Sequence, residues 1–489
     1  MGLKQEAVQG VVWSAAQKWG VRLISFFVTL VLARLVLPES FGLVAYATVF
    51  ISFAGVFIDQ GFSDAIVQFA HLDREHLDTA FWIGVLTGIA FTLATFLSAG
   101  LIANLLHEPR LAPIIKWLSL SFILSPLSGV QGDLLRRKLA FKVLMIRSMI
   151  STVISGTVAV VMAFLGFGVW SLVAKLLVDS AVNVIVMWRV SDWRPGFHFS
   201  RSHFKQLFSF GINIVGGDFV DFLSVHSDDF LIGYFLGPVA LGYYTLAYNL
   251  LIMLTDILVS VPNKVSFPIF SRIQNDLERM KSAFYEVTQL QSLMAFPVFL
   301  GLCAVAPEAV RVLYGDNWAA SIPVIQILML MGIVRSASYF YSSIFRASGK
   351  PSWRFGIYAL TAAFNVAGFL IVVRMGIVAV AVSYVVVSYT LMPLYFLLIQ
   401  KLIHITIRSH LSQYFPAFVA SLVMISVVLG LKHFLGENFS MAIRLAFLVI
   451  AGALIYLVSI RLIRPVMFTK ILELAQMAMP KFRPSKIEP

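Results

Sequence analysis

Cysteine and charge are both scarce in this sequence. Its 489 residues include a single cysteine, Cys303, which excludes an intramolecular disulfide framework and a cysteine-cluster metal site. Only 12% of the residues are charged, whereas soluble domains usually have roughly 25%. Hydrophobic residues make up 59% of the chain, and the mean hydropathy is +0.88. This balance predicts a polytopic membrane protein.

Sequence motifs of the common enzyme classes are missing as well. The chain has no phosphate-binding G-x-x-x-x-G-K-[ST] loop, no G-x-S-x-G nucleophile elbow and no H-E-x-x-H zinc motif. The Asp228-Asp229 pair resembles the paired acids of membrane glycosyltransferases, but those enzymes usually carry a sizeable extramembrane domain. The longest predicted connection here, 263–286, is too short for such a domain. We therefore predict a transporter with no catalytic residues, no metal site and no bound cofactor.

Apolar runs long enough to cross a membrane recur along the chain, each needing about 20 largely apolar residues. The predicted spans are 8–36, 41–66, 77–104, 111–130, 143–165, 168–188, 207–234, 239–262, 287–310, 321–345, 355–373, 376–400, 412–431 and 441–460. The predicted fold is therefore all-α, a polytopic membrane protein with about 14 transmembrane helices.

The distribution of basic residues predicts the orientation of these spans. With the N-terminus placed in the cytoplasm, 25 of the 37 Lys and Arg residues fall on the cytoplasmic side, six on the outer side and six within spans. Cytoplasmic loops of membrane proteins carry such an excess of positive charge. We therefore expect a multi-pass protein of the cell inner membrane with both termini cytoplasmic. The net charge of +13 then reflects topology, and no nucleic-acid partner is expected.

A short motif occurs twice, about 200 residues apart. Pro38-x-x-Phe41-Gly42 returns as Pro238-x-x-Leu241-Gly242, and two weaker matches follow in the same order. Because six spans separate the copies, both would enter the membrane in the same direction, as in a parallel repeat. The sequence thus predicts two pseudo-symmetric six-helix lobes plus two C-terminal helices. The predicted units are 1–200 (N-terminal lobe), 201–404 (C-terminal lobe), 405–464 (extra spans) and 465–489 (a basic, amphipathic cytoplasmic tail at the lipid surface).

The first span carries two cations near its middle. Lys18 and Arg22 are one helical turn apart and share a polar stripe with Ser14, Ser25 and Thr29. A charge at the centre of a bilayer costs about 2.5–3.5 kcal/mol on insertion scales. Such residues usually face a protein interior or a water-filled cavity, so we expect this stripe to face inward.

The seventh span carries anions where its repeat partner carries cations. Asp218, Asp221, Asp228 and Asp229 fall on one arc of about 100° on a helical wheel. Two interpretations follow. The aspartates pair with the cations of the first span and hold the lobes together, or both sets line a central cavity.

Further cations lie within other spans. Lys175 and Asp179 are spaced i, i+4 and are expected to neutralise each other. The remaining in-span cations have no obvious partner on their own helix and are predicted to form an anion-binding cavity: Lys18, Arg22, Lys116, Arg147 and Arg335.

Carboxylates near the inner ends of two equivalent spans are candidates for a coupling-ion site. Asp59, with Asp64 close by, lies on the second span, and Asp256 lies on the eighth. Membrane carboxylates often bind protons or cations, but they also close helix ends. A proton and a sodium ion are equally compatible with these residues. His226, beside the aspartates of the seventh span, is read as a hydrogen-bonding group rather than a metal ligand.

Two segments resemble a known family. LVLARLVLPESFG (residues 30–42) and DQGFSDAIVQ (residues 59–68) are similar to the opening pattern of Wzx-type polysaccharide flippases, in particular the colanic-acid and teichuronic-acid export branch. These flippases belong to the superfamily that also contains multidrug and toxin extruders and the peptidoglycan-precursor flippase. The resemblance extends over the chain as two lobes, two extra spans and basic cytoplasmic loops.

The resemblance implies an undecaprenyl-diphosphate-linked oligosaccharide as substrate, moved from the inner to the outer leaflet by alternating access. It also implies work alongside a polysaccharide polymerase and export machinery, in the biosynthesis of surface polysaccharide. Lys and Arg are natural partners of phosphate oxygens, so the in-span cations fit a diphosphate. Two alternatives stay open: a cation-coupled multidrug exporter, which would have an acidic and aromatic cavity, and a membrane enzyme acting on the lipid-linked sugar.

Overall fold

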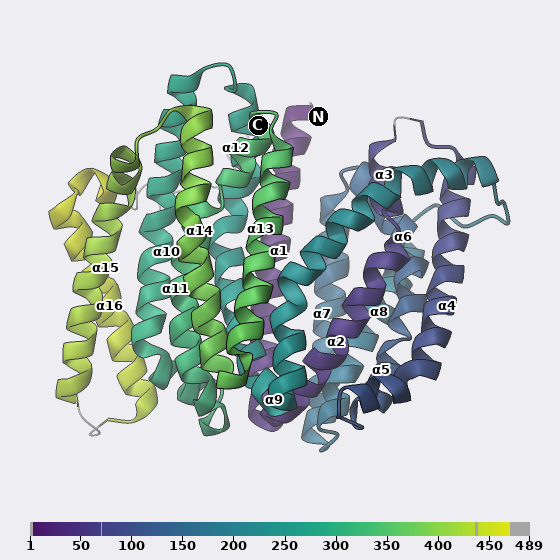
Figure 1. Cartoon of the computed structure of the whole chain (residues 1–489), viewed down its shortest axis with the longest axis horizontal. Coiled ribbons are helices and arrows are strands. Elements are labelled where there is room, and N and C mark those ends of the chain that lie inside the picture. Colours follow the sequence, from purple (N-terminus) through teal and green to yellow (C-terminus); the bar gives the residue numbers. More distant parts are fainter. Residues whose placement is uncertain (1–2, 70, 436–438, 470–489) are drawn as a thin grey trace, which may run out of the picture.

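The computed structural model describes residues 3–69, 71–435 and 439–469 and is helical throughout this part, with no β-strand (Figure 1). The side chains of residues 3–18, 213, 259–269 and 351 are outside the description. The tail predicted for 465–489 lies almost entirely beyond the described residues. The predicted all-α polytopic class is confirmed.

The first half of the chain forms eight helices before the long central one. They are α1 (Leu3–Leu35), α2 (Pro38–Asp59), α3 (Phe62–Gln68), α4 (Arg74–Leu105), α5 (Leu111–Leu118), α6 (Ser121–Arg137), α7 (Phe141–Phe164) and α8 (Val169–Val190). A Pro at the first helical position begins α2, where its missing N–H is not needed.

The second half begins with α9, a pair of helices that run on from one another through a bend. Its elements are α9 (Arg201–Arg272), α10 (Leu277–Leu313), η1 (Asp316–Ser321), α11 (Ile322–Ser338), α12 (Tyr341–Ala347), α13 (Pro351–Val372), η2 (Val373–Met375), α14 (Ile377–Ile403), α15 (Ile407–Leu435) and α16 (Met441–Ile463). Figure 1 shows α15 and α16 at one flank of the molecule, beside α10.

Twelve helical segments of the described residues are long and apolar enough to cross a membrane. One of them, Arg201–Leu258, contains two of the fourteen predicted spans. These two are separated by Gly237, whose φ of +81° and ψ of 176° break the helix. Glycine adopts this backbone conformation without the steric cost that a side chain would add. The twelve do not include α1, the first predicted span, in which the side chains of residues 3–18 are not described.

The two copies of the repeated motif contact each other. A Cβ added to Gly42 would collide with the carbonyl oxygen of Pro238, and one added to Gly242 would collide with that of Pro38. In this contact the glycine of each copy meets the proline of the other copy, and such a reciprocal arrangement is typical of a two-fold relation. It fits the pseudo-symmetry of the predicted lobes, and it requires glycine at both positions.

The first half of α9 runs along α2 in the opposite direction. Tyr46 packs near Phe230, Phe53 packs near Phe222, and Gly61 lies against Gly211. The helix therefore starts close to α3 and reaches its bend at the start of α2. We call these two ends of the bundle the α3 end and the Gly237 end.

Contacts between the halves of the chain close the Gly237 end. The Trp318 indole is fully buried, donates a hydrogen bond to the Ala33 carbonyl at 2.7 Å and meets Phe41 edge to face at 5.2 Å. The Arg34 guanidinium donates to the Val312 and Leu313 carbonyls at the end of α10. The end of α1 is thereby fixed to the second half of the chain.

Candidate functional site

A cavity of about 380 Å³ lies between α1, α2, α8 and the two halves of α9. Arg22 of α1 and Lys175 of α8 line it, together with His226 and Asp229 of α9. The Nδ1 atom of His226 is 3.7 Å from the Asp229 carboxylate. The cavity therefore has two cations from the N-terminal half and an acid–histidine pair from α9. We call it the central cavity.

Arg22 forms an ion pair with Asp256 on the second half of α9. The side chains are 46% and 32% exposed, so water reaches both, and a pair of this kind is weak. The structure thus joins a predicted phosphate ligand to a predicted coupling residue. The cross-lobe partner of Arg22 is Asp256, whereas the sequence suggested the aspartates of the seventh span.

A second cavity, of about 450 Å³, begins on the other side of this ion pair. Asp256 lines it, and Ile252 lines both this cavity and the central one. Its cations are Arg335, Arg346 and Arg354. Among its aromatic residues is Tyr384, which accepts a hydrogen bond from Arg335 at 3.4 Å. We call it the arginine cavity.

Arg354 shows that this cavity is suited to anions. Its guanidinium lies 5.2 Å from the centre of the Tyr358 ring, and its Nε is buried without a hydrogen-bond partner. A buried donor without an acceptor is costly, and a bound anion would supply the acceptor. The sequence placed Arg346 and Arg354 in cytoplasmic loops, so only the fold reveals that they line a cavity.

A third cavity, of about 610 Å³, lies within the N-terminal half and is acidic. Asp59, Asp64 and Asp133 line it together with Arg136 and Arg147. The buried Asp133 carboxylate accepts hydrogen bonds from Ser63 at 2.7 Å and from Arg136 at 3.3 Å. The sequence treated Asp133 as a loop residue because the predicted span ended before it. We call this the acidic cavity.

The four aspartates of the seventh span do not act as one set. Asp218 and Asp221 are exposed, and Asp229 lines the central cavity. Asp228 is buried: its carboxylate accepts from the Tyr244 hydroxyl at 2.7 Å and from the backbone N–H of Asp229 at 3.0 Å. Since Gly237 separates Asp228 from Tyr244, this hydrogen bond braces the bend of α9.

Replacing Tyr244 with phenylalanine is expected to destabilise the protein by about 1–3 kcal/mol. The change leaves an oxygen of Asp228 buried without its donor, and that desolvation is not compensated. Thermal unfolding in detergent measures the effect. Tyr234→Phe is the matched control, because Tyr234 is exposed on the same helix. Equal unfolding temperatures for the two variants would contradict this role of the hydrogen bond.

The other predicted cations are dispersed. Arg147 lines the acidic cavity, and its Nε is buried without a hydrogen-bond partner. Lys116 lies on the short helix α5, 5.0 Å from the Phe96 ring centre, and does not line the central, arginine or acidic cavity. Although α5 ends at Leu118, it forms one candidate membrane span with α6, Leu111–Arg137, which contains the predicted span 111–130. Lys18 lies where side chains are not described, so its phosphate role stays a prediction.

Lys175 differs from its prediction. Among the described side chains it forms no ion pair with Asp179, whose carboxylate instead accepts a hydrogen bond from Asn183 at 3.2 Å. Lys175 lines the central cavity with Arg22. Helical spacing made local neutralisation reasonable, but the cavity between the helices gives the ammonium a different environment.

Comparison with known proteins identifies the family. Residues 31–323 match the family model described as polysaccharide biosynthesis protein. The chain belongs to this family. It is 29% identical to the lipopolysaccharide biosynthesis protein WzxC of Escherichia coli, with 88% of this chain and 89% of WzxC covered. It is 32% identical to the succinoglycan biosynthesis transport protein ExoT of Rhizobium meliloti, with 68% and 67% covered.

A solved structure shares the whole architecture. The lipid II flippase MurJ in an inward closed conformation superimposes with a TM-score of 0.75 at 15% identity. The match covers 95% of this chain and all of the MurJ chain. At this level of identity, the likeness establishes the fold alone.

Proposed function

We propose that this protein is a flippase that moves an undecaprenyl-diphosphate-linked oligosaccharide across the inner membrane for surface polysaccharide biosynthesis. The observation that carries the proposal is the run of cations beside the Arg22–Asp256 pair. Arg22 and Lys175 line the central cavity, and Asp256 lines the arginine cavity with Arg335, Arg346 and Arg354. Membership of a polysaccharide biosynthesis family supplies the class of substrate.

A diphosphate fits these cavities for electrostatic reasons. It carries roughly two negative charges, and guanidinium groups bind phosphate oxygens through paired hydrogen bonds. The Arg22–Asp256 pair is partly exposed and weak, so an incoming phosphate can replace the Asp256 carboxylate at little cost. Arg22 is then paired with Asp256 when the cavity holds no substrate, and with phosphate when the substrate is bound.

Alternating access follows from the closed Gly237 end. The excess of Lys and Arg in the loops of the sequence supports our proposal that the α3 end and both termini are cytoplasmic. The contacts of Trp318 and Arg34 then seal the outer side. Reporter fusions at each terminus test this orientation, and an external C-terminus would overturn it.

The acidic cavity is the favoured coupling-ion site. Asp59 and Asp64 are exposed within it, whereas Asp256 is already paired with Arg22. Asp59→Asn is expected to abolish ion-dependent flipping and to leave lipid binding intact, because the substitution removes only the titratable charge. Asp192→Asn, in an exposed loop, is the control. Full ion-dependent transport by the Asp59 variant would make this carboxylate structural.

The multidrug-exporter alternative draws support from this acidic cavity and from the aromatic side chains of the arginine cavity. The cationic lining of the other two cavities repels cationic drugs and favours an anionic substrate. We also propose that the protein does no chemistry on the sugar and works upstream of a polymerase and export machinery.

The decisive experiment is reconstitution. The purified protein in vesicles is supplied with fluorescent undecaprenyl-diphosphate oligosaccharide, and its appearance in the opposite leaflet is followed by chemical quenching. Protein-dependent translocation that is not shared by an undecaprenyl chain lacking the diphosphate supports the proposal. Transport of cationic drugs without lipid movement would overturn it.

A further inference from the structure

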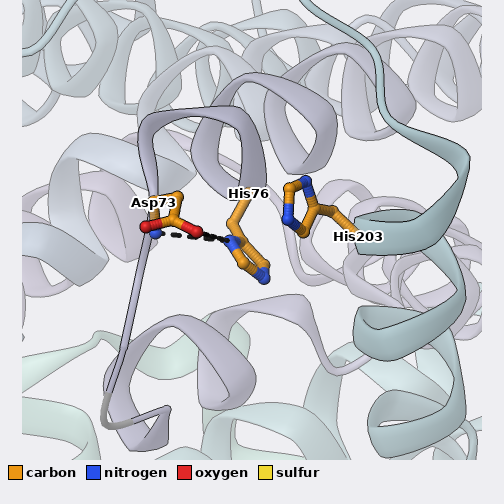
Figure 2. Close-up of side chains that lie close together, drawn as sticks. All are labelled: Asp73, His76 and His203. Carbon is orange, nitrogen blue, oxygen red and sulfur yellow. Dashed lines mark hydrogen bonds and ion pairs between the residues drawn. The ribbon is translucent and has the colours of Figure 1, made fainter.

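A histidine cluster lies at the α3 end, outside the three cavities. Asp73 precedes α4, His76 is in the first turn of α4, and His203 is in the first turn of α9 (Figure 2). One potential ligand atom from each of them lies within 4.8 Å of the others. The imidazole rings of His76 and His203 have centroids only 3.8 Å apart. Nothing in the proposed transport cycle requires this cluster.

The hydrogen bonds of His76 show which of its ring nitrogens could bind a metal ion. The His76 Nε2 atom lies 3.3 Å from the Gln206 amide oxygen, which only accepts, so the ring proton is on Nε2. The Nδ1 atom in turn accepts a long hydrogen bond from the Asp73 backbone N–H at 3.3 Å. Metal-binding histidines commonly donate the second ring N–H to a neighbouring group, as His76 Nε2 does here, so a metal ion at Nδ1 would replace the long hydrogen bond from Asp73.

His203 presents the second nitrogen. Its Nδ1 atom is buried without a hydrogen-bond partner, and the nearest carboxylate oxygen, from Glu75, is 3.4 Å away. The side chains of His76 and His203 are 6% and 18% exposed, whereas those of Asp73 and Glu75 are 74% and 56% exposed. The nitrogens are therefore shielded, and the carboxylates leave a path for an ion from water.

We propose that Asp73, His76 and His203, with Glu75 beside His203, form a binding site for a divalent transition-metal ion of the Zn²⁺ type. Two imidazole nitrogens and one carboxylate oxygen suit Zn²⁺, Co²⁺ or Ni²⁺, whereas Mg²⁺ and Ca²⁺ prefer oxygen ligands alone. Bonds of about 2.0–2.2 Å to Zn²⁺ require the ligand atoms to come closer together, which requires the side chains to rotate.

The site joins two parts of the chain that other bonds already hold together. The connection before α9 is fixed to α4 by a hydrogen bond from the Trp82 indole to the Gly196 carbonyl at 2.7 Å. A second runs from the Ser200 N–H to the Thr79 hydroxyl at 3.2 Å. A bound ion would link the first turn of α9 to α4. This turn is the end of α9 that lies opposite the bend at Gly237. This inference does not depend on the proposed function, because metal binding is measured without transport.

The test uses the full-length protein in detergent, freed of purification tag and stripped of metal with a chelator. We expect one Co²⁺ per chain, seen by its visible absorption and displaced by Zn²⁺, and an unfolding temperature that rises with Zn²⁺. His203→Gln and Asp73→Asn should each weaken binding at least tenfold while unfolding like the parent without metal, because Asn also caps a helix. His71→Gln, an exposed histidine nearby, is the control.

Either of two results would overturn the site. One is that the parent protein binds Co²⁺ and Zn²⁺ no more strongly than Mg²⁺, in which case the cluster is only a helix cap. The other is binding that His203→Gln leaves unchanged, which places the ion elsewhere.

Discussion

Replacement of Arg22 with glutamine is expected to lower flipping of lipid-linked oligosaccharide at least tenfold. A charge-assisted hydrogen bond to phosphate contributes about 1.5–3 kcal/mol, which is roughly ten- to a hundredfold in affinity. Arg22→Lys should recover only part of the loss, because an ammonium keeps the charge but not the two-pronged geometry of the guanidinium. Flipping in vesicles and binding of the lipid in detergent measure the two effects separately.

Asp256 supplies the control that separates substrate binding from lobe pairing. If Arg22 serves only to neutralise Asp256, the double variant Arg22→Gln, Asp256→Asn should regain transport. If Arg22 binds the diphosphate, transport by the double variant should stay as low as transport by Arg22→Gln alone. The double-mutant cycle then shows no rescue. Lys116→Gln is the matched control, a cation outside the three cavities, and is expected to transport normally. Rescue by the Asp256 change would remove Arg22 from the phosphate site.

Gly42→Val is expected to abolish transport by preventing closure of the Gly237 end. Any Cβ at residue 42 would overlap the carbonyl oxygen of Pro238, which is backbone and cannot rotate away. The contact exists only while the start of α2 meets the bend of α9, so the variant should favour a state open at this end. Gly100→Ala, with no atom within 4 Å of the added carbon, is the control and should transport normally.

Accessibility distinguishes a shifted conformation from a misfolded protein. The probe is Ala45→Cys in a Cys303→Ser background, because Ala45 lines the central cavity. This cysteine should react with a membrane-impermeant thiol reagent added outside only when Gly42 is also replaced with valine. Normal transport together with unchanged labelling would contradict the closure model. Failure of the variant to assemble into the membrane would be detected separately by its thermal unfolding.

The sequence by itself determined the class of the protein and the composition of its helices. Low charge, repeated apolar runs and the loop bias of Lys and Arg are local quantities, and they sufficed to predict an all-α membrane protein. The LVLARLVLPESFG segment added the resemblance to polysaccharide flippases. The repeat could also be recognised in the sequence, because the contact requires glycine at both residue 42 and residue 242. The cost of burying Arg22 in a membrane marked it as a functional candidate before its surroundings were known.

Only the tertiary structure decided which charges meet. Helical spacing fixes the direction of a side chain on its own helix but not the helix opposite, so Arg22 paired with Asp256 across 234 residues, while Lys175 faced the central cavity. Lys116 packs against Phe96 away from the other cations, and the bend at Gly237 brings Tyr244 to the Asp228 carboxylate. His76 and His203 came together because the connection before α9 folds back onto α4. Each outcome depends on long-range packing, which no local pattern in the chain encodes.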